Sequence, residues 1–215
     1  MNHYEQTQSV MNEVRKGTTT VGLVCKEGVI IAADKKASAM YIENRYERKV
    51  YPINDRVAIT TAGMVGDLQY LTRVLKAEAS LQEMRSGVMS PKSAATLLSN
   101  ILHGNRYYPF MVMLLVGGYD EDGPALYSVD PVGGVTNGEK IFTTGSGGPI
   151  ALGVLESQFK PDMTIEEGLK LAIRALKAAK ERDLYTGGIG FNVVVIRKDG
   201  LEDLSSDKID KLSAT

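Results

Sequence analysis

The sequence predicts an α+β fold: a four-layer αββα sandwich in which two antiparallel sheets stack face to face and helix pairs cover their outer sides. Strand patterns come in groups joined by hairpin turns, and helix patterns come in pairs. This order differs from the regular strand–helix alternation of a doubly wound parallel sheet. Residues 29–33 (VIIAA) and 111–116 (MVMLLV) are apolar on both sides, which predicts strands buried between layers.

Two hairpins open the predicted fold. Residues 18–25 (TTTVGLVC) and 29–33 are rich in β-branched and apolar side chains, and the turn at 26–28 (KEG) separates them. Residues 50–53 and 56–61 form a second strand pair with a short Asn-Asp connection. We therefore expect four strands before the first helix.

Helical spacing begins at residue 65. Apolar residues recur there with the period of a helix over 65–85. They form one stripe that comprises Leu68, Leu71, Leu75 and Ala79. A second helix starts with Ser90 as N-cap and Pro91 at the first helical position, and it ends near residue 103. We expect the leucine stripe to pack in the core and not to form an interface.

The second half repeats the order of strands followed by helices. Three strands are predicted at 110–116, 125–129 and 140–144. A short helix is expected at 149–158, and Thr164 with Glu167 forms a capping box that opens a longer one. The apolar face of this longer helix comprises Leu169, Ala172, Ile173 and Leu176. A last hairpin joins 191–197 to 201–204 around a Lys-Asp-Gly turn.

Length and charge fit one globular domain. The chain has 215 residues, enough to bury a sizeable core. Its formal net charge of -1 provides no basic excess for nucleic acid or an anionic membrane, so neither is expected as a partner. No apolar stretch approaches the roughly 20 residues of a membrane span. Residues 1–17 are polar and lack a signal-peptide core, so we interpret them as a leader before a single domain over 18–215.

Cysteine and histidine are too scarce for a metal centre. Cys25 is the only cysteine, and its apolar neighbours predict a buried thiol. One cysteine allows no intrachain disulfide, which fits a reducing cytoplasm. His3 and His103 lie far apart in the chain, so a His/Cys metal site is not expected.

Thr18 begins the local pattern with the most catalytic potential. A threonine hydroxyl is a weak nucleophile and needs a nearby base. If the bond between Gly17 and Thr18 is cut, the freed α-amine of Thr18 titrates near pH 8 and can accept the hydroxyl proton. Taken alone, the threonine run is explained more simply by β-propensity. Asp34, Lys49 and Gly63, each taken alone, are ordinary strand-end charges and a turn glycine.

The motifs of the chain, in their order, resemble those of proteasome β subunits, most closely the archaeal ones. The matching segments are KGTTTVGLVCKEGVIIAADKKAS at 16–38, RKVYPI at 48–53, TTAGMVGDLQYL at 60–71, TTGSGGPIALGVLE at 143–156 and AAKERD at 178–183. The resemblance extends from Gly17 to about Arg197. It implies the N-terminal nucleophile hydrolase fold and a threonine endopeptidase of the proteasome core, which is made active by self-cleavage between Gly17 and Thr18.

The resemblance also implies catalytic roles for matching residues. Thr18 corresponds to the nucleophile, and a nearby Lys49 ammonium would favour its deprotonated forms. Asp34 would pair with Lys49, and the Gly63 backbone N–H would stabilise the oxyanion. The supporting polar residues around the threonine amine correspond to Ser146, Asp183 and Thr186.

Substrate-binding positions follow from the same resemblance. The backbone of Ser38 corresponds to a strand that pairs with an extended peptide. Ala37, Thr61 and Val65 correspond to the lining of the pocket for the residue before the cut. Because these three side chains are small and uncharged, we expect cleavage after apolar residues rather than after strongly charged ones.

Partners are likewise implied by the family, which needs no metal or organic cofactor. A β subunit of this kind forms heptameric rings with other β subunits, stacks against rings of proteasome α subunits, and receives unfolded polypeptides through a gate that an ATPase regulator opens. The leader would keep the amine blocked until assembly encloses Thr18. The expected location is the cytoplasm.

Several positions depart from the usual family pattern, and all were expected around the threonine amine. Gly148 replaces a second serine after Ser146, Leu184 and Thr186 replace serines, and Asn192 follows Phe191 where Ile-Asp is more usual. These departures keep a second hypothesis open, a structural β subunit that is inactive or left unprocessed. A third is another amidohydrolase of the same fold.

Overall fold

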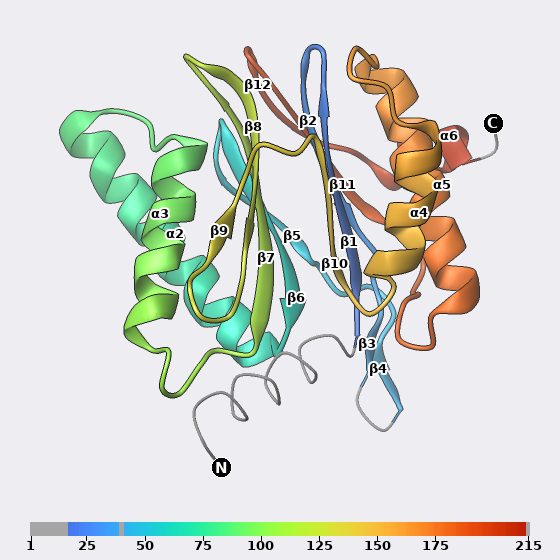
Figure 1. The fold of residues 1–215 in the computed structure, drawn as a ribbon, viewed down its shortest axis with the longest axis horizontal. Coiled ribbons are helices and arrows are strands. Elements are labelled where there is room, and N and C mark those ends of the chain that lie inside the picture. The colour runs from blue at the N-terminus through green and yellow to red at the C-terminus, as the bar shows by residue number, and fades with distance from the viewer. Residues whose placement is uncertain (1–16, 39–40, 214–215) are drawn as a thin grey trace.

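The computed structural model describes residues 17–38 and 41–213, which form a mixed α+β fold of two stacked sheets and outer helices (Figure 1). The expected α+β class is confirmed. The predicted leader, apart from Gly17, lies outside the described residues. No helix in the described ranges combines the length and apolarity that crossing a membrane requires.

The first five-stranded sheet carries the residues that follow Gly17. Its strand order is β10-β1-β2-β11-β12, and each neighbouring pair is antiparallel. The strands are β1 (Thr19–Cys25), β2 (Gly28–Ala33), β10 (Ile141–Gly145), β11 (Asn192–Arg197) and β12 (Gly200–Asp203). The first and the last strands of the fold therefore share one sheet, in which β11 pairs with β2.

The second five-stranded sheet has the order β5-β6-β7-β8-β9 and is also antiparallel. Its strands are β5 (Val50–Asn54), β6 (Val57–Gly63), β7 (Val112–Asp120), β8 (Gly123–Val129) and β9 (Val135–Thr136). A separate two-stranded ribbon, β3 (Ala37–Ser38) with β4 (Ile42–Asn44), projects beside the first sheet in Figure 1.

Each sheet is covered on its outer side by two helices. In Figure 1, α2 (Val65–Ser86) and α3 (Pro91–Gly104) lie over the second sheet, and α4 (Gly148–Gln158) and α5 (Ile165–Arg182) lie over the first. A short α6 (Ser206–Ser213) packs near α5. The predicted caps are confirmed, since Ser90 caps α3 before Pro91 and Thr164 forms a capping box with Glu167.

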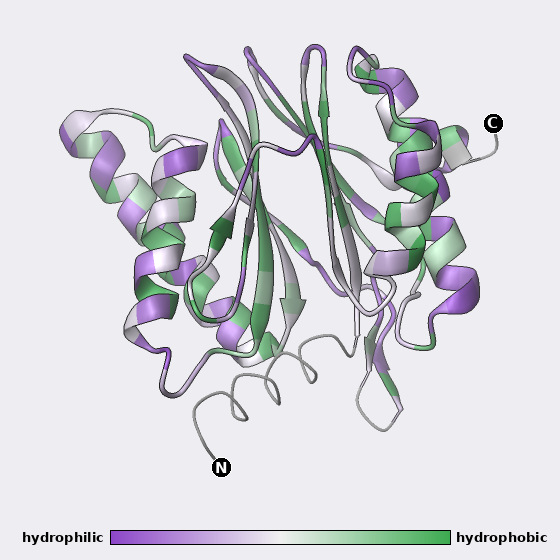
Figure 2. Cartoon of the chain, viewed as in Figure 1, coloured by the Kyte–Doolittle hydropathy of each residue, from purple (hydrophilic) through white to green (hydrophobic). Residues whose placement is uncertain are grey.

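Three apolar clusters fill the spaces between these layers, and Figure 2 shows hydrophobic residues concentrated there. Alternation along β1 decides which side each residue faces. Val21 and Leu23 pack with α5, whereas Val24 packs between the sheets. The predicted leucine stripe of α2 is confirmed as core, because Leu71 and Leu75 are fully buried.

The main differences from the predicted elements are short or glycine-containing segments. The ribbon β3–β4, the strand β9 and the helix α6 were not predicted, because elements this short carry too few residues to establish a period. The strand predicted at 110–116 has different bounds, since β7 begins at Val112 and continues to Asp120. Gly117 and Gly118 lie inside it because a Cβ there would lie 2.8 Å from Ile31 and 2.6 Å from the Arg56 carbonyl oxygen, respectively.

Candidate active site

Thr18 lies immediately before β1 in a conformation that is unusual for its residue type. Its φ is 75°, and Gly17 has a φ of 106°. Positive φ is uncommon outside glycine and is strained for a β-branched side chain. This turn explains why β1 begins at Thr19 and not at Thr18 as predicted. Thr18 is nonetheless buried, with 7% of its surface exposed.

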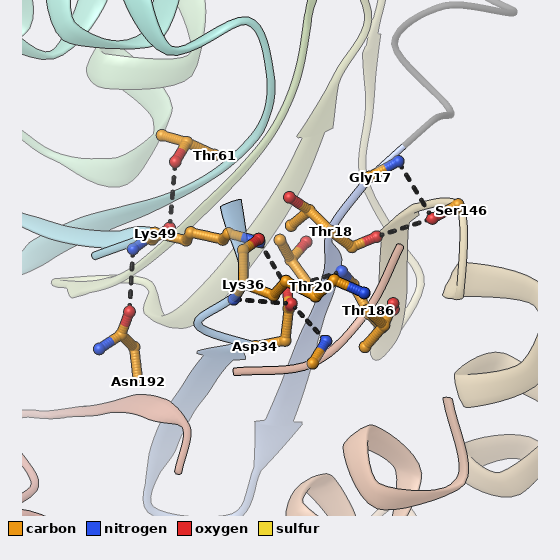
Figure 3. A network of polar contacts seen from close by, with 12 residues as sticks. Gly17, Thr18, Thr20, Asp34, Lys36, Lys49, Thr61, Ser146, Thr186 and Asn192 are labelled. Atoms are coloured by element: carbon orange, nitrogen blue, oxygen red, sulfur yellow. Dashed lines mark hydrogen bonds and ion pairs between the residues drawn. The ribbon is translucent and has the colours of Figure 1, made fainter. Parts of the chain in front are cut away.

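Lys49 and Asp34 form a buried ion pair beside Thr18 (Figure 3). Lys49 Nζ lies 2.9 Å from Asp34 Oδ1 and also donates to the Lys36 carbonyl oxygen at 2.5 Å. Asp34 is fully buried and Lys49 is 5% exposed. Burial lowers the pKa of the Lys49 ammonium, and the charge and hydrogen bond of Asp34 oppose that shift.

Three backbone N–H groups hold the Asp34 carboxylate in place. Thr19 N donates to Oδ1 at 3.0 Å, and Gly187 N and Lys36 N donate to Oδ2 at 2.8 and 3.2 Å. With Lys49 Nζ, the carboxylate accepts four hydrogen bonds. The lysine is therefore held by an anion whose own position is fixed from three parts of the chain.

The backbone of Lys49 is also held on both sides. Its N–H donates to Asn192 Oδ1 at 2.9 Å, and its carbonyl oxygen accepts from Thr61 N at 2.9 Å and Thr61 Oγ1 at 3.3 Å. The sequence analysis had placed Asn192 around the threonine amine, and this was wrong. Asn192 contacts the lysine backbone because it begins β11, which lies next to β2.

A second polar group, the hydroxyl cluster, comprises Ser146, Asp183, Thr186 and Thr19. Ser146 Oγ donates to Asp183 Oδ2 at 2.7 Å and accepts from Gly17 N at 3.2 Å. Thr186 Oγ1 also donates to Asp183 Oδ2, at 2.5 Å. Because the Thr186 proton is used in this way, the 2.6 Å contact with Thr19 Oγ1 requires Thr19 to donate.

Glycines allow this cluster to approach Thr18 closely. A Cβ at Gly145 would lie 2.1 Å from the Thr18 carbonyl oxygen, and one at Gly147 would lie 2.1 Å from Thr19 Oγ1. Gly145 also has a φ of 85°. The two glycines on either side of Ser146 are therefore required by the fold and not merely tolerated.

Gly63 lies at the end of β6, just before α2. Its φ is 132°, and a Cβ would lie 1.9 Å from the Met111 carbonyl oxygen. No other residue type fits this position without displacing the backbone. Gly63 lines the same pocket as Thr18.

A pocket of about 590 Å³, partly open to solvent, joins most of the predicted residues. The predicted residues that line it are Thr18, Lys49, Gly63, Ala37, Ser38, Thr61 and Val65. Four predicted residues lie behind the lining: Asp34, Ser146, Asp183 and Thr186. Asp34 contacts Lys49, and Thr186 contacts Thr19. The lining also contains the predicted processing residue Gly17, and it contains six residues that were not predicted: Lys36, Glu43, Glu47, Arg48, Tyr51 and Leu68.

Thr19 was also missed, although its signal was available. Alternation along an extended strand turns Thr19 away from the face of Thr20, towards the helices.

Cys25 lies on the same side of β1 as Thr19 and is 2% exposed, and burial raises the pKa of its thiol to about 12. The described residues contain no cluster of histidine, cysteine and carboxylate side chains suited to a metal ion.

Sequence comparison with known proteins identifies the family of this chain. The family model described as "Proteasome subunit" matches residues 14–196. The chain is 54% identical over 204 residues to the proteasome subunit β of Methanocaldococcus vulcanius, covering 93% of this chain and 91% of the relative. It is 48% identical over 205 residues to that of Archaeoglobus profundus, covering 94% and 95%.

The chain therefore belongs to the proteasome subunit family. Within that family its similarity is to β subunits, including that of Methanococcus maripaludis at 47% identity over 201 residues. These relatives support a β subunit of the proteasome core, which assembles with other subunits into the core particle.

Proposed function

We propose that the chain is a threonine endopeptidase subunit of the proteasome core, with Thr18 as its nucleophile. The observation that carries this proposal is the position of Thr18 on a pocket, next to a buried Lys49–Asp34 ion pair and directly after Gly17. Residues 1–17 are a propeptide and 18–215 form the catalytic domain, which adopts the αββα fold of N-terminal nucleophile hydrolases.

Self-cleavage uses the strained junction between Gly17 and Thr18. The Thr18 hydroxyl attacks the Gly17 carbonyl carbon, the C–N bond breaks, and the hydroxyl proton passes to the departing Thr18 amine. Water then hydrolyses the resulting ester and releases Gly17 as a carboxylate. The left-handed backbone at Thr18 costs about 1–3 kcal/mol, and cleavage relieves it because a free N-terminus has no φ constraint.

The free amine of Thr18 then serves as the base for peptide hydrolysis. It accepts the hydroxyl proton as the oxygen attacks a substrate carbonyl. The positive charge of Lys49 favours the neutral amine and the developing alkoxide, and Asp34 keeps that charge in position. The Gly63 N–H stabilises the oxyanion. Ser146, Asp183 and Thr186 orient the amine; in the uncleaved chain Ser146 Oγ accepts from Gly17 N, the amide one residue before the future amine.

Substrate binds as an extended polypeptide along Ser38, with the side chain before the cut in the pocket lined by Ala37, Thr61 and Val65. Small uncharged walls favour apolar side chains there. Glu43 and Glu47 line the pocket together with Lys36, Arg48 and Lys49, so the lining has no excess of negative charge. In a panel of peptides that differ only at this position, we expect Leu, Tyr or Phe to rank above Arg and Glu. A ranking headed by Arg or Glu contradicts this assignment.

The remaining assignments concern the assembly. We assign the chain to heptameric rings of β subunits that stack on rings of α subunits in the cytoplasm, with unfolded polypeptides as substrates and an ATPase regulator at the gate. A structural, unprocessed subunit is not favoured, because Thr18, Lys49, Asp34 and Gly63 are all present and meet at one place.

The test is Thr18→Ala in particles assembled with the α subunit. Intact mass should show wild-type chains that begin at Thr18 and variant chains that keep residues 1–17, and peptidase activity should be lost in the variant. Gel filtration is the control for assembly. A Thr18→Ala particle that retains activity rules out Thr18 as nucleophile, and wild-type chains that keep the leader in complete particles favour the structural subunit.

A further inference from the structure

The space between the two sheets is lined mainly by apolar side chains, but three threonines interrupt it. Thr20 and Thr60 are fully buried and Thr144 is 2% exposed. Thr60 Oγ1 donates to Thr20 Oγ1 at 3.1 Å, and Thr20 Oγ1 lies 2.6 Å from Thr144 Oγ1. Leu115 N donates to Thr60 Oγ1 at 3.2 Å. The three hydroxyls thus form one continuous buried chain.

The direction of each side chain follows from its strand. Along β1 the side chains alternate, so Thr20 lies on the inner face with Val24 while Thr19 faces the helices. Along β6, Ala58 packs between the sheets and Thr60 lies two residues further on the same face. Thr20 and Thr144 are direct partners within the first sheet, whereas Thr60 belongs to the second.

The Thr60–Thr20 bond therefore crosses from one sheet to the other. Among the described residues, no other side-chain hydrogen bond joins a strand residue of one five-stranded sheet to a strand residue of the other. The ion pair of Lys49 with Asp34 also spans the gap, but Lys49 precedes β5 and is not itself in a strand.

The two ends of this bond lead to the two halves of the candidate active site. Thr20 lies on β1, two residues after Thr18. Thr60 directly precedes Thr61, which holds the Lys49 carbonyl oxygen, and it precedes Gly63 by three residues. Thr18 lies immediately before β1 of the first sheet, whereas Lys49 immediately precedes β5 and Gly63 ends β6 in the second sheet.

We propose that Thr20 and Thr60 are positioning residues whose hydroxyl bond, together with the Lys49–Asp34 ion pair, sets the distance between the nucleophile and the Lys49–Gly63 half of the site. The inference rests on the proposed function. Apolar side chains could slide past one another at little cost, whereas a hydrogen bond demands one distance and direction. A displacement of about 1 Å at a catalytic site can lower the rate about a hundredfold.

The test compares Thr60→Val with Thr144→Val in particles assembled with the α subunit. Both changes replace a buried hydroxyl with a methyl group of similar shape, but only Thr60 joins the two sheets. We expect Thr60→Val to lower kcat about tenfold with KM unchanged and to slow leader removal. Thr144→Val should change kcat less than about twofold, and Thr60→Ser, which keeps the hydroxyl, should restore most of the activity.

Other outcomes overturn the inference. Equal losses of kcat in Thr60→Val and Thr144→Val, or no rescue by Thr60→Ser, mean that the hydroxyls only fill the core. If Thr60→Val does not assemble, Thr60→Ser and Thr60→Cys provide the comparison, since they differ little in size but strongly in hydrogen bonding; equal kcat in this pair overturns the proposal. A wild-type particle without Thr18-dependent activity instead overturns the proposed function, and the positioning role with it.

Discussion

The two carboxylates predicted to take part in catalysis, Asp34 and Asp183, are supported in opposite ways. Asp34 is fully buried and accepts one ammonium and three backbone N–H groups. Asp183 is half-buried and accepts from two side-chain hydroxyls, those of Ser146 and Thr186. One carboxylate is thus held by the backbone and a charge, and the other by side chains that substitution can exchange.

The two sides are therefore expected to tolerate substitution differently. Backbone donors remain whatever side chains surround them, so the Asp34 side depends on the fold as a whole. The Asp183 side depends on individual hydroxyls, and Thr186 supplies one where serine is more usual. Leu184 and Gly148 lie in the loop and helix start of that same side. The departure at Asn192 falls instead on the Lys49 backbone, where its side chain makes a specific bond.

The largest expected effect comes from Asp34→Asn. The amide cannot balance the Lys49 charge, and it presents an N–H donor towards a site filled with donors. Loss of one partner of a buried ion pair costs about 3–5 kcal/mol, so we expect kcat/KM to fall at least about a hundredfold and leader removal to slow. Peptidase assays and intact mass of assembled particles check this, and a variant with more than a tenth of wild-type activity contradicts it.

The pH dependence of the remaining activity sharpens the comparison. Burial lowers the pKa of Lys49 and Asp34 raises it, so Asp34→Asn lowers that pKa further. If the ammonium is required, activity is present below this pKa and is lost as pH rises through it. The alkaline loss of kcat/KM should therefore move to lower pH in Asp34→Asn. Asp183→Asn should leave it in place, because Asp183 does not contribute to the Lys49 shift.

Asp183→Asn makes the same chemical change at the other carboxylate, with a smaller expected effect. Both hydroxyls donate to Asp183 Oδ2, so the amide oxygen of asparagine can accept both from that position, and no buried cation loses its partner. We expect kcat to fall about tenfold, since a hydrogen bond worth about 1.5–3 kcal/mol with a charged acceptor is worth about 0.5–1.5 kcal/mol with a neutral one. Steady-state kinetics alongside Asp34→Asn checks the ranking. If Asp183→Asn proves the more harmful of the two, the hydroxyl cluster has the larger share in catalysis.

The sequence could predict which residues meet at the site better than it could predict how they are held. Strand and helix patterns, the caps at Ser90 and Thr164, and the order of family motifs follow from local residue types. The Asp34 contacts with Gly187 N and Lys36 N do not, because they depend on how distant loops fold over the sheet. Every residue except proline has a backbone N–H, so the residue types cannot show which of these groups bind a carboxylate.

The same reason explains the missed hydroxyls of Thr19, Thr20 and Thr60. Threonine is common in strands for its β-propensity, so its presence there signals nothing further. Only the register of β1 against β10 and the stacking of the two sheets reveal which hydroxyls meet. Alternation could have assigned Thr19 and Thr20 to opposite faces, but not their partners.

The smallest effect is expected for Thr186→Ser, which restores the usual hydroxyl of the family. Serine keeps both bonds of this position, the donation to Asp183 and the acceptance from Thr19. Only a buried methyl group is lost, at about 0.8 kcal/mol of stability. We expect kcat within about twofold of wild type and a slightly lower melting temperature. Thr186→Val is the matched control, because it keeps the shape, removes the hydroxyl and leaves Thr19 without its acceptor. A larger loss of kcat in Thr186→Ser than in Thr186→Val would show that methyl packing, and not hydrogen bonding, governs the Asp183 side.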